Sequence, residues 1–138
     1  MGIPTVTALY GSLNALFNIA LATMVVRHRG KSGVSIGEGA IDKRDKQSVK
    51  DLALAIRIHA NNAEFVPLAI ITMLLAELCG GSSYLLHIAG GVLLISRVLH
   101  AIGMPRPAPN FFRAAGVGGT WILICALAAW TLLLRTRQ

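Results

Sequence analysis

The sequence predicts an all-α integral membrane protein, an up-down-up-down bundle of four transmembrane helices. Of its 138 residues, 54% are hydrophobic and only 14% are charged, whereas a soluble domain carries about 25% charged residues. The hydrophobic residues also gather in runs of the roughly 20 residues that a helix needs to cross a bilayer. These runs occupy residues 3–26, 52–78, 84–104 and 111–134. The whole chain, 1–138, is therefore interpreted as one membrane domain.

The first run, 3–26, is interpreted as a helix and not as a secretory signal. Its basic residues follow the apolar stretch, and the run is longer than the 7–15 apolar residues of a signal. A linker at 27–50, rich in glycine and charge, separates it from the second run, 52–78.

The later connections are short. Gly80 and Gly81, followed by two serines, predict a tight turn after the second run. Three prolines between 105 and 109 end the third run, because proline lacks an N–H and disfavours helix in the residue before it. Short connections favour antiparallel neighbours, which gives the up-down-up-down order.

The net charge of +7 is distributed unevenly. Seven basic residues lie in the 27–50 linker, and Arg106 and Arg113 lie near the third connection, against Arg135 and Arg137 at the C-terminus. Under the positive-inside rule, loops one and three are cytoplasmic, and both termini and the 79–83 turn lie on the opposite side. The charge is thus explained by topology and by contact with membrane lipids, and a nucleic-acid partner is disfavoured.

The second run carries a polar stretch from Arg57 to Pro67. A charge near the middle of a membrane helix costs about 2.5–3.5 kcal/mol, so such groups mark a functional site by default. Arg57, Asn61 and Glu64 have i, i+4, i+7 spacing and share one helix face. His59 and Asn62 are expected to point elsewhere.

Two further polar stripes follow helical spacing: Arg97, His100 and Met104 in the third run, and Tyr10, Asn14 and Asn18 in the first. At 1.5 Å per residue, the arginines and His100 fall in the cytoplasmic half, with Glu64 deeper. The three stripes can converge on one site only in the bundle interior or at a subunit interface.

Two interpretations of these polar groups remain open. The groups can satisfy one another through interhelical hydrogen bonds, which contribute a modest ~0.6 kcal/mol each. Alternatively, the excess of guanidinium over carboxylate binds an anionic ligand. The sequence has no metal-ligand spacing, and Cys79 and Cys125 are interpreted as small apolar residues.

The motif Arg57-x-His59-x-Asn61-x-x-Glu64-x-x-Pro67 resembles the signature of the MAPEG family, the membrane-associated proteins in eicosanoid and glutathione metabolism. Arg97-x-x-His100-x-x-Gly103, followed by a short loop and Arg113, is similar as well. The resemblance covers essentially the whole chain and fits the bacterial branch best. It implies a homotrimer in the bacterial inner membrane, with glutathione as co-substrate bound between subunits near the cytoplasmic side.

The resemblance also implies roles for single residues. Arg57 and Arg97 would hold the carboxylates of glutathione, Glu64 its ammonium and Asn61 its peptide backbone. Arg113 would stabilise the thiolate, which would attack a lipophilic electrophile or hydroperoxide. The remaining binding residues are His100 and, from the neighbouring subunit, Arg27.

The sequence departs from the eicosanoid enzymes of the family at three positions. Met104 stands where a tyrosine is often found, Ala114 where one enzyme has a serine, and Ala60 where it has an arginine. These changes argue against a prostaglandin or leukotriene activity. The loss of hydroxyl groups at Met104 and Ala114 favours the alternative of a non-catalytic lipid- or ligand-binding scaffold. A proton-coupled carrier using Glu64 and His100 is disfavoured, because no inverted repeat is visible.

Overall fold

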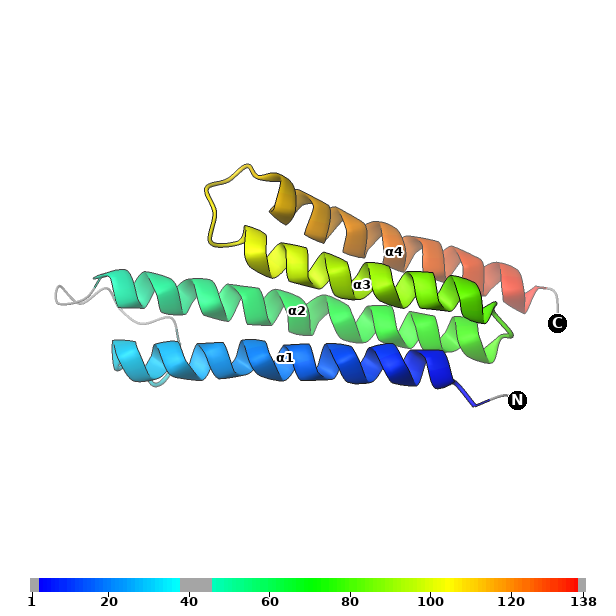
Figure 1. The fold of residues 1–138 in the computed structure, drawn as a ribbon, viewed down its shortest axis with the longest axis horizontal. Coiled ribbons are helices and arrows are strands. Elements are labelled where there is room, and N and C mark those ends of the chain that lie inside the picture. Colours follow the sequence, from blue (N-terminus) through cyan, green and yellow to red (C-terminus); the bar gives the residue numbers. More distant parts are fainter. Residues whose placement is uncertain (1–2, 38–45, 137–138) are drawn as a thin grey trace.

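The computed structural model describes residues 3–37 and 46–136, which form a bundle of antiparallel helices (Figure 1). Each helix is long and apolar enough to cross a membrane. The predicted fold class, a membrane bundle of four helices, is therefore confirmed. The helices are α1 (Thr5–Ser32), α2 (Lys46–Leu78), α3 (Ser83–Gly103) and α4 (Phe111–Arg135).

The first two helices are longer than their apolar runs. α1 continues from the predicted end at residue 26 to Ser32, and α2 begins at Lys46 instead of residue 52. Hydropathy marks only the part of a helix in lipid, whereas arginine and lysine continue a helix readily in water. Gly33 closes α1 in a left-handed conformation, with φ of 68°, and its N–H donates to the Arg29 carbonyl at 2.9 Å.

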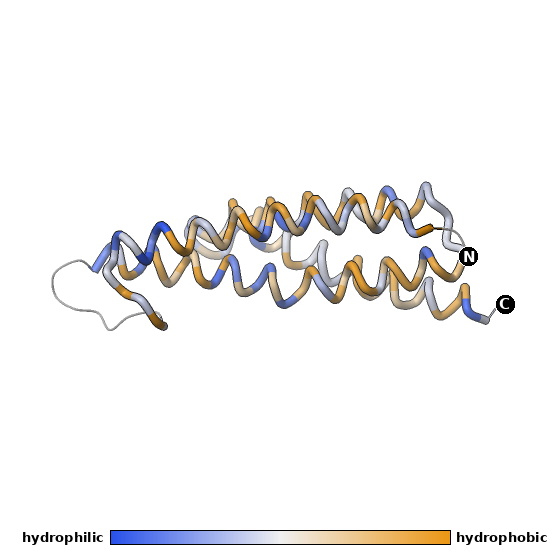
Figure 2. Tube along the Cα trace, turned by 90° about the horizontal axis from the view of Figure 1, so that it is seen from below, coloured by the Kyte–Doolittle hydropathy of each residue, from blue (hydrophilic) through white to orange (hydrophobic). Residues whose placement is uncertain are grey.

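The expected 27–50 linker thus shrinks to residues 33–45, of which 38–45 lie outside the described residues. The 33 residues of α2 span about 50 Å, against a hydrocarbon core of about 30 Å. Both α1 and α2 extend past the α3–α4 connection in Figure 1. Figure 2 shows hydrophilic residues gathered toward this extended end.

The opposite end holds the apolar core. Val6, Met73, Leu86 and Leu127 are buried there together with two alanines. The predicted turn joins α2 to α3 at this end, and the Gly81 N–H donates to the Ala76 carbonyl at 2.9 Å. The membrane bundle is therefore closed by apolar packing at one end, and most of the predicted site residues lie from its middle toward the other end.

Glycines let α3 and α4 approach closely. A Cβ on Gly116 would lie 2.5 Å from the backbone nitrogen of His100, and one on Gly103 would clash with the backbone of Arg113. Small residues at a helix contact allow this approach in membranes, where no hydrophobic force drives helices together. The close contact fixes the start of α4 against the end of α3.

Candidate functional site

A pocket of about 320 Å³ opens between α2, α3 and α4. It brings together Arg57, Asn61 and Glu64 from α2, as the shared-face prediction requires. The other lining residues are Ala60, His100, Met104, Arg113, Val117 and Trp121. Most of the predicted site residues therefore meet in one place.

The depth of this pocket follows from the antiparallel packing. α2 ends at Leu78 and α3 begins at Ser83, so the 21 residues of α3 return to about the level of Arg57. α4 then starts nearby, which brings Arg113 to the same level. The pocket lies where the α3–α4 pair ends, close to the expected membrane boundary.

The charged side chains of the pocket are open. Arg57, Glu64 and Arg113 are all exposed on this chain. Within residues 3–37 and 46–136, none of their side chains makes a hydrogen bond or an ion pair. Two guanidinium groups and one carboxylate thus face the same space without neutralising one another.

Arg97, expected to contact a ligand directly, lies behind the pocket wall. It is 2% exposed and is not among the lining residues. Its guanidinium donates to Asn61 Oδ1 at 2.6 Å, to Asn62 Oδ1 at 3.2 Å and to Thr120 Oγ1 at 3.2 Å. Sequence reasoning gave the side of α3 that carries Arg97, but the long side chain extends inward to α2 and α4.

Asn62 has a larger part in this arrangement than predicted. It does point away from the Arg57 face, but it is 1% exposed and accepts from Arg97 while donating to Asn18 Oδ1 at 3.0 Å. A signal existed in the sequence, because a buried arginine at this depth must find acceptors. Two adjacent asparagines on different faces can supply them.

The polar stripe of α1 does not line this pocket on a single chain. Asn14 and Asn18 line a separate groove of about 270 Å³ between α1 and α2. Tyr10 instead meets His87 on α3, with ring centroids 5.8 Å apart. Asn62 is the link between Asn18 and Arg97, because it donates to the first and accepts from the second.

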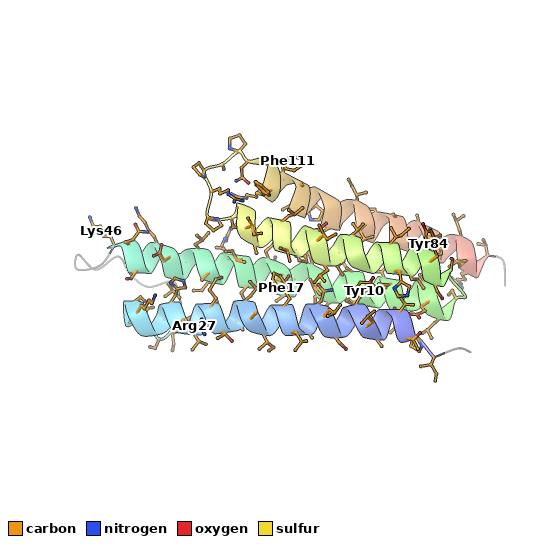
Figure 3. All side chains as sticks on the ribbon, viewed as in Figure 1. Tyr10, Phe17, Arg27, Lys46, Tyr84 and Phe111 are labelled. Carbon is orange, nitrogen blue, oxygen red and sulfur yellow. The ribbon has the colours of Figure 1, made fainter. Side chains whose placement is uncertain are left out.

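Arg27 also lies elsewhere on this chain. It lines a groove along α1 together with Thr23, Met24, His28 and Lys31. Figure 3 shows Arg27 on α1 and Phe111, at the start of α4, on opposite edges of the bundle. On a single chain, Arg27 therefore lies apart from the pocket that Arg57 and Arg113 line.

Arg113 is placed by the first turn of α4. Asn110 caps this helix, with its Oδ1 accepting the Arg113 N–H at 2.9 Å. The Asn110 Nδ2 also donates to the carbonyls of Gly103 and Pro107, both at 3.1 Å. One asparagine thus joins the end of α3, the connection and the start of α4.

An apolar groove of about 500 Å³ adjoins the polar pocket. The two share Arg113, Val117 and Trp121. The other residues that line the groove come from α4 and the connection before it. They are Asn110 and four small or apolar residues: Ala108, Pro109, Ala114 and Gly118. Arg113 therefore stands between a charged cavity and an apolar one.

His100 is the remaining predicted residue. It lines the pocket but is only 3% exposed, and among the described residues neither ring nitrogen has a hydrogen-bond partner. Gly116 lies against its backbone. A buried imidazole without hydrogen-bond partners is costly.

The helix bundle and its pocket define a class of protein: a multi-pass membrane protein with a pocket, lined by charged residues, that opens on the side of one chain. The sequence model of the MAPEG family matches residues 7–133, and the chain belongs to this family. It is 36% identical over 127 residues to the inner membrane protein YecN of Escherichia coli strain K12, covering 92% of this chain and 88% of that protein. The same protein of E. coli O6:H1 gives the same values. No solved structure matches the chain.

Proposed function

We propose that this protein is a membrane glutathione transferase or peroxidase that acts on lipophilic electrophiles or hydroperoxides. One observation carries the proposal: the pocket holds two guanidinium groups and one carboxylate that have no partner among the described residues, and Arg113 also borders the apolar groove. Membership of the MAPEG family supports glutathione as the thiol.

The charges of the pocket suit glutathione, which carries two carboxylates, one ammonium and a thiol. Arg57 suits a carboxylate, since guanidinium binds carboxylate with two parallel hydrogen bonds. Glu64, about 10 Å further along α2, suits the ammonium. Asn61 lies between them and suits the peptide backbone, whereas Arg97 supports Asn61 from behind.

The volume of the pocket supports a site shared between subunits. Its 320 Å³ on one chain lies at the low end of the range for ligand sites. Arg57 and Glu64 are also exposed at a depth where charge must face protein, water or ligand. A homotrimer in which Arg27 of a neighbouring subunit closes the pocket would meet both requirements.

Arg113 would act on the thiol. The thiolate is the nucleophile, and an unperturbed cysteine thiol has a pKa of about 8.5. A guanidinium beside the sulfur favours the anion, and each unit by which the thiol pKa falls corresponds to about 1.4 kcal/mol. Arg113 is exposed and lines both cavities, so it can hold the sulfur at their junction.

The apolar groove would hold the second substrate, which enters from the lipid. With a chlorinated aromatic, sulfur bonds to the ring carbon and chloride leaves with the electron pair. With a hydroperoxide, sulfur takes the terminal oxygen as the O–O bond breaks, and an alcohol is released. A second glutathione then converts the sulfenic acid to a disulfide and water.

Two observations support the proposed location and orientation. The related YecN is an inner membrane protein, which supports the bacterial inner membrane for this chain. The basic residues at the extended end of α1 and α2 support a cytoplasmic location for that end and for the pocket near it. Exposed leucine, isoleucine and valine side chains over the helices contact lipid or other subunits.

Titration of glutathione into the detergent-purified protein, followed by calorimetry, tests binding. We expect saturable heat from the wild type and an affinity at least tenfold weaker for Arg57→Ala, because a charge-assisted hydrogen bond contributes about 1.5–3 kcal/mol. Arg135→Ala, at the far end of α4, is the matched control and should bind normally. No heat from the wild type would end the proposal.

A non-catalytic ligand-binding scaffold is the second candidate. It is favoured by Met104 and Ala114, which offer no hydroxyl group to a thiol at the two cavities. A conjugation assay with a chlorinated aromatic acceptor separates the candidates. Activity that disappears in Arg113→Ala identifies a transferase, whereas glutathione binding without turnover of an aromatic halide or a hydroperoxide identifies a scaffold.

A further inference from the structure

The neighbours of Asn61 determine which end of its carboxamide faces the pocket. A carboxamide has an acceptor oxygen and a donor nitrogen, whereas guanidinium has donors only. The Arg97 Nη2 lies 2.6 Å from Asn61 Oδ1, so the oxygen faces inward. The Asn61 Nδ2 has no partner among residues 3–37 and 46–136, and Asn61 lines the pocket.

The same arginine orients a second carboxamide. Its Nε donates to Asn62 Oδ1 at 3.2 Å, and Asn62 Nδ2 then donates to Asn18 Oδ1 at 3.0 Å. Both α2 asparagines therefore turn their oxygens toward Arg97 and their N–H groups away from it. Along this chain of hydrogen bonds, each residue donates to the next, and the first donor is the Arg97 guanidinium.

Arg97 cannot easily leave this position. It is 2% exposed, and its Nη1 donates to Thr120 Oγ1, whose hydroxyl donates to the Gly116 carbonyl at 2.8 Å. All three acceptors are neutral, so within the described residues no carboxylate offsets the buried charge. A cation behind the carboxamide polarises it and strengthens its N–H groups as donors.

We infer that Arg97 is a positioning residue that makes Asn61 present only N–H donors to the pocket. The part of the ligand seated at Asn61 is then an acceptor, a carbonyl or carboxylate oxygen. A hydroxyl or amide N–H that needs an acceptor is rejected there. This inference rests on the proposed function for the choice of glutathione as the probe, but not for the orientation of Asn61 itself.

Binding measurements with glutathione separate orientation from charge. Asn61→Asp keeps an oxygen for Arg97 but replaces the donor with a second oxygen, so we expect at least a tenfold loss of affinity, about the loss of one good hydrogen bond. Asn62→Asp adds the same charge beside the same guanidinium without touching the pocket. We expect a clearly smaller loss. Equal losses in the two variants, or no loss in Asn61→Asp, would overturn the inference.

A double-mutant cycle tests whether Arg97 acts through Asn61. Arg97→Lys keeps the charge but cannot hold three acceptors at once. We expect Arg97→Lys and Asn61→Ala each to weaken glutathione binding roughly tenfold, and the double variant to bind no more weakly than Asn61→Ala. Losses that multiply to about a hundredfold would show independent action and contradict the inference.

One readout needs no ligand, so it remains decisive if glutathione does not bind. In protein with ¹⁵N-labelled asparagine, side-chain NH₂ signals are assigned by substituting each asparagine in turn. Arg97→Lys should shift or broaden the signals of Asn61 and Asn62. The signals of Asn14, which donates to the Tyr10 carbonyl, should stay in place. Unchanged Asn61 signals would overturn the orientation, whereas absent binding with changed signals would overturn only the proposed function.

Discussion

Two glutamates on α2, Glu77 and Glu64, have different roles: the first caps a helix and the second lines the pocket. Glu77 accepts the backbone N–H groups of Val6 at 2.9 Å and Thr7 at 2.7 Å. It thereby caps α1, whose N-cap residue Pro4 provides no side-chain hydrogen bond. A carboxylate at a helix N-terminus is also favoured by the helix dipole. Glu64 has no such partner among the described residues and faces the pocket.

Replacement of each glutamate by glutamine should therefore have opposite effects. Glu77→Gln removes the charge from a cap and should lower the free energy of unfolding by about 1 kcal/mol, with glutathione affinity unchanged. Glu64→Gln should change the free energy of unfolding by less than about 0.5 kcal/mol, but weaken glutathione binding at least tenfold. Thermal unfolding in detergent and calorimetry measure the two quantities. Equal destabilisation by both variants would contradict the distinction.

The sequence predicted which helix face carries a residue better than it predicted where the end of a long side chain lies. Spacing along α2 placed Arg57, Asn61 and Glu64 on one face, and the pocket contains all three. The same arithmetic put Arg97 beside His100, but angles locate a Cβ and not the end of a long side chain. The Arg97 side chain lies behind the pocket wall, where it donates to Asn61 and Asn62.

Among the elements, the α3–α4 pair sets the geometry around Arg113. Gly116 lies on the backbone of His100, and Gly103 lies on the backbone of Arg113. Asn110 adds a clamp of three hydrogen bonds across the connection. The position of Arg113 thus depends on residues that do not line the polar pocket.

Added volume at Gly116 should separate packing from helix propensity. Gly116→Ala would place a methyl group against the backbone of α3, and overpacking costs about 1–3 kcal/mol. Gly91→Ala is the matched control, because a Cβ there meets nothing within 4 Å. It should leave stability unchanged or raise it by up to about 1 kcal/mol. Unfolding temperatures in one detergent compare the two, and a harmless Gly116→Ala would refute the close packing.

Two substitutions at Asn110 separate its cap from its clamp. Asn110→Asp keeps an oxygen for the Arg113 N–H but loses both donations to carbonyls, whereas Asn110→Ala loses everything. We expect Asn110→Ala to lower the free energy of unfolding by about 1 kcal/mol and Asn110→Asp by less. Both should lower the rate of conjugation, since Arg113 is less firmly held. A conjugation rate that stays at the wild-type value in Asn110→Ala would show that the clamp does not position Arg113.

Helix boundaries illustrate what apolar patterns can predict. The α2–α3 turn and the end of α3 lie where glycine and proline indicated, because these residues act on the backbone directly. The end of α1 and the start of α2, both on the basic side, lie beyond their apolar runs. A helix that leaves the membrane can continue, because it keeps its hydrogen bonds in water. Gly33, the residue that ends α1, was visible in the sequence but lay inside an expected linker.

For the whole molecule, the decisive feature is that charged groups of the pocket are exposed on the side of a membrane bundle. Arg57, Glu64 and Arg113 face outward between α2 and α4. Arg27 lies on α1, at another face. Closed symmetry brings one face of a subunit against a different face of the next when three subunits form a ring. A trimer could thus join the Arg27 face to the open pocket of its neighbour, which a single sequence cannot reveal.

Mixed assemblies test this arrangement. Arg27→Ala and Arg113→Ala should each abolish conjugation alone. Coexpressed in equal amounts, they should recover activity, because about one interface in four then combines an intact Arg27 from one subunit with an intact pocket from the next. Coexpression of Arg57→Ala with Arg113→Ala is the control, since both residues belong to one pocket and no interface is intact. Recovery in the first pair and not in the second requires a site built from two chains, whereas failure of both would place Arg27 outside the site.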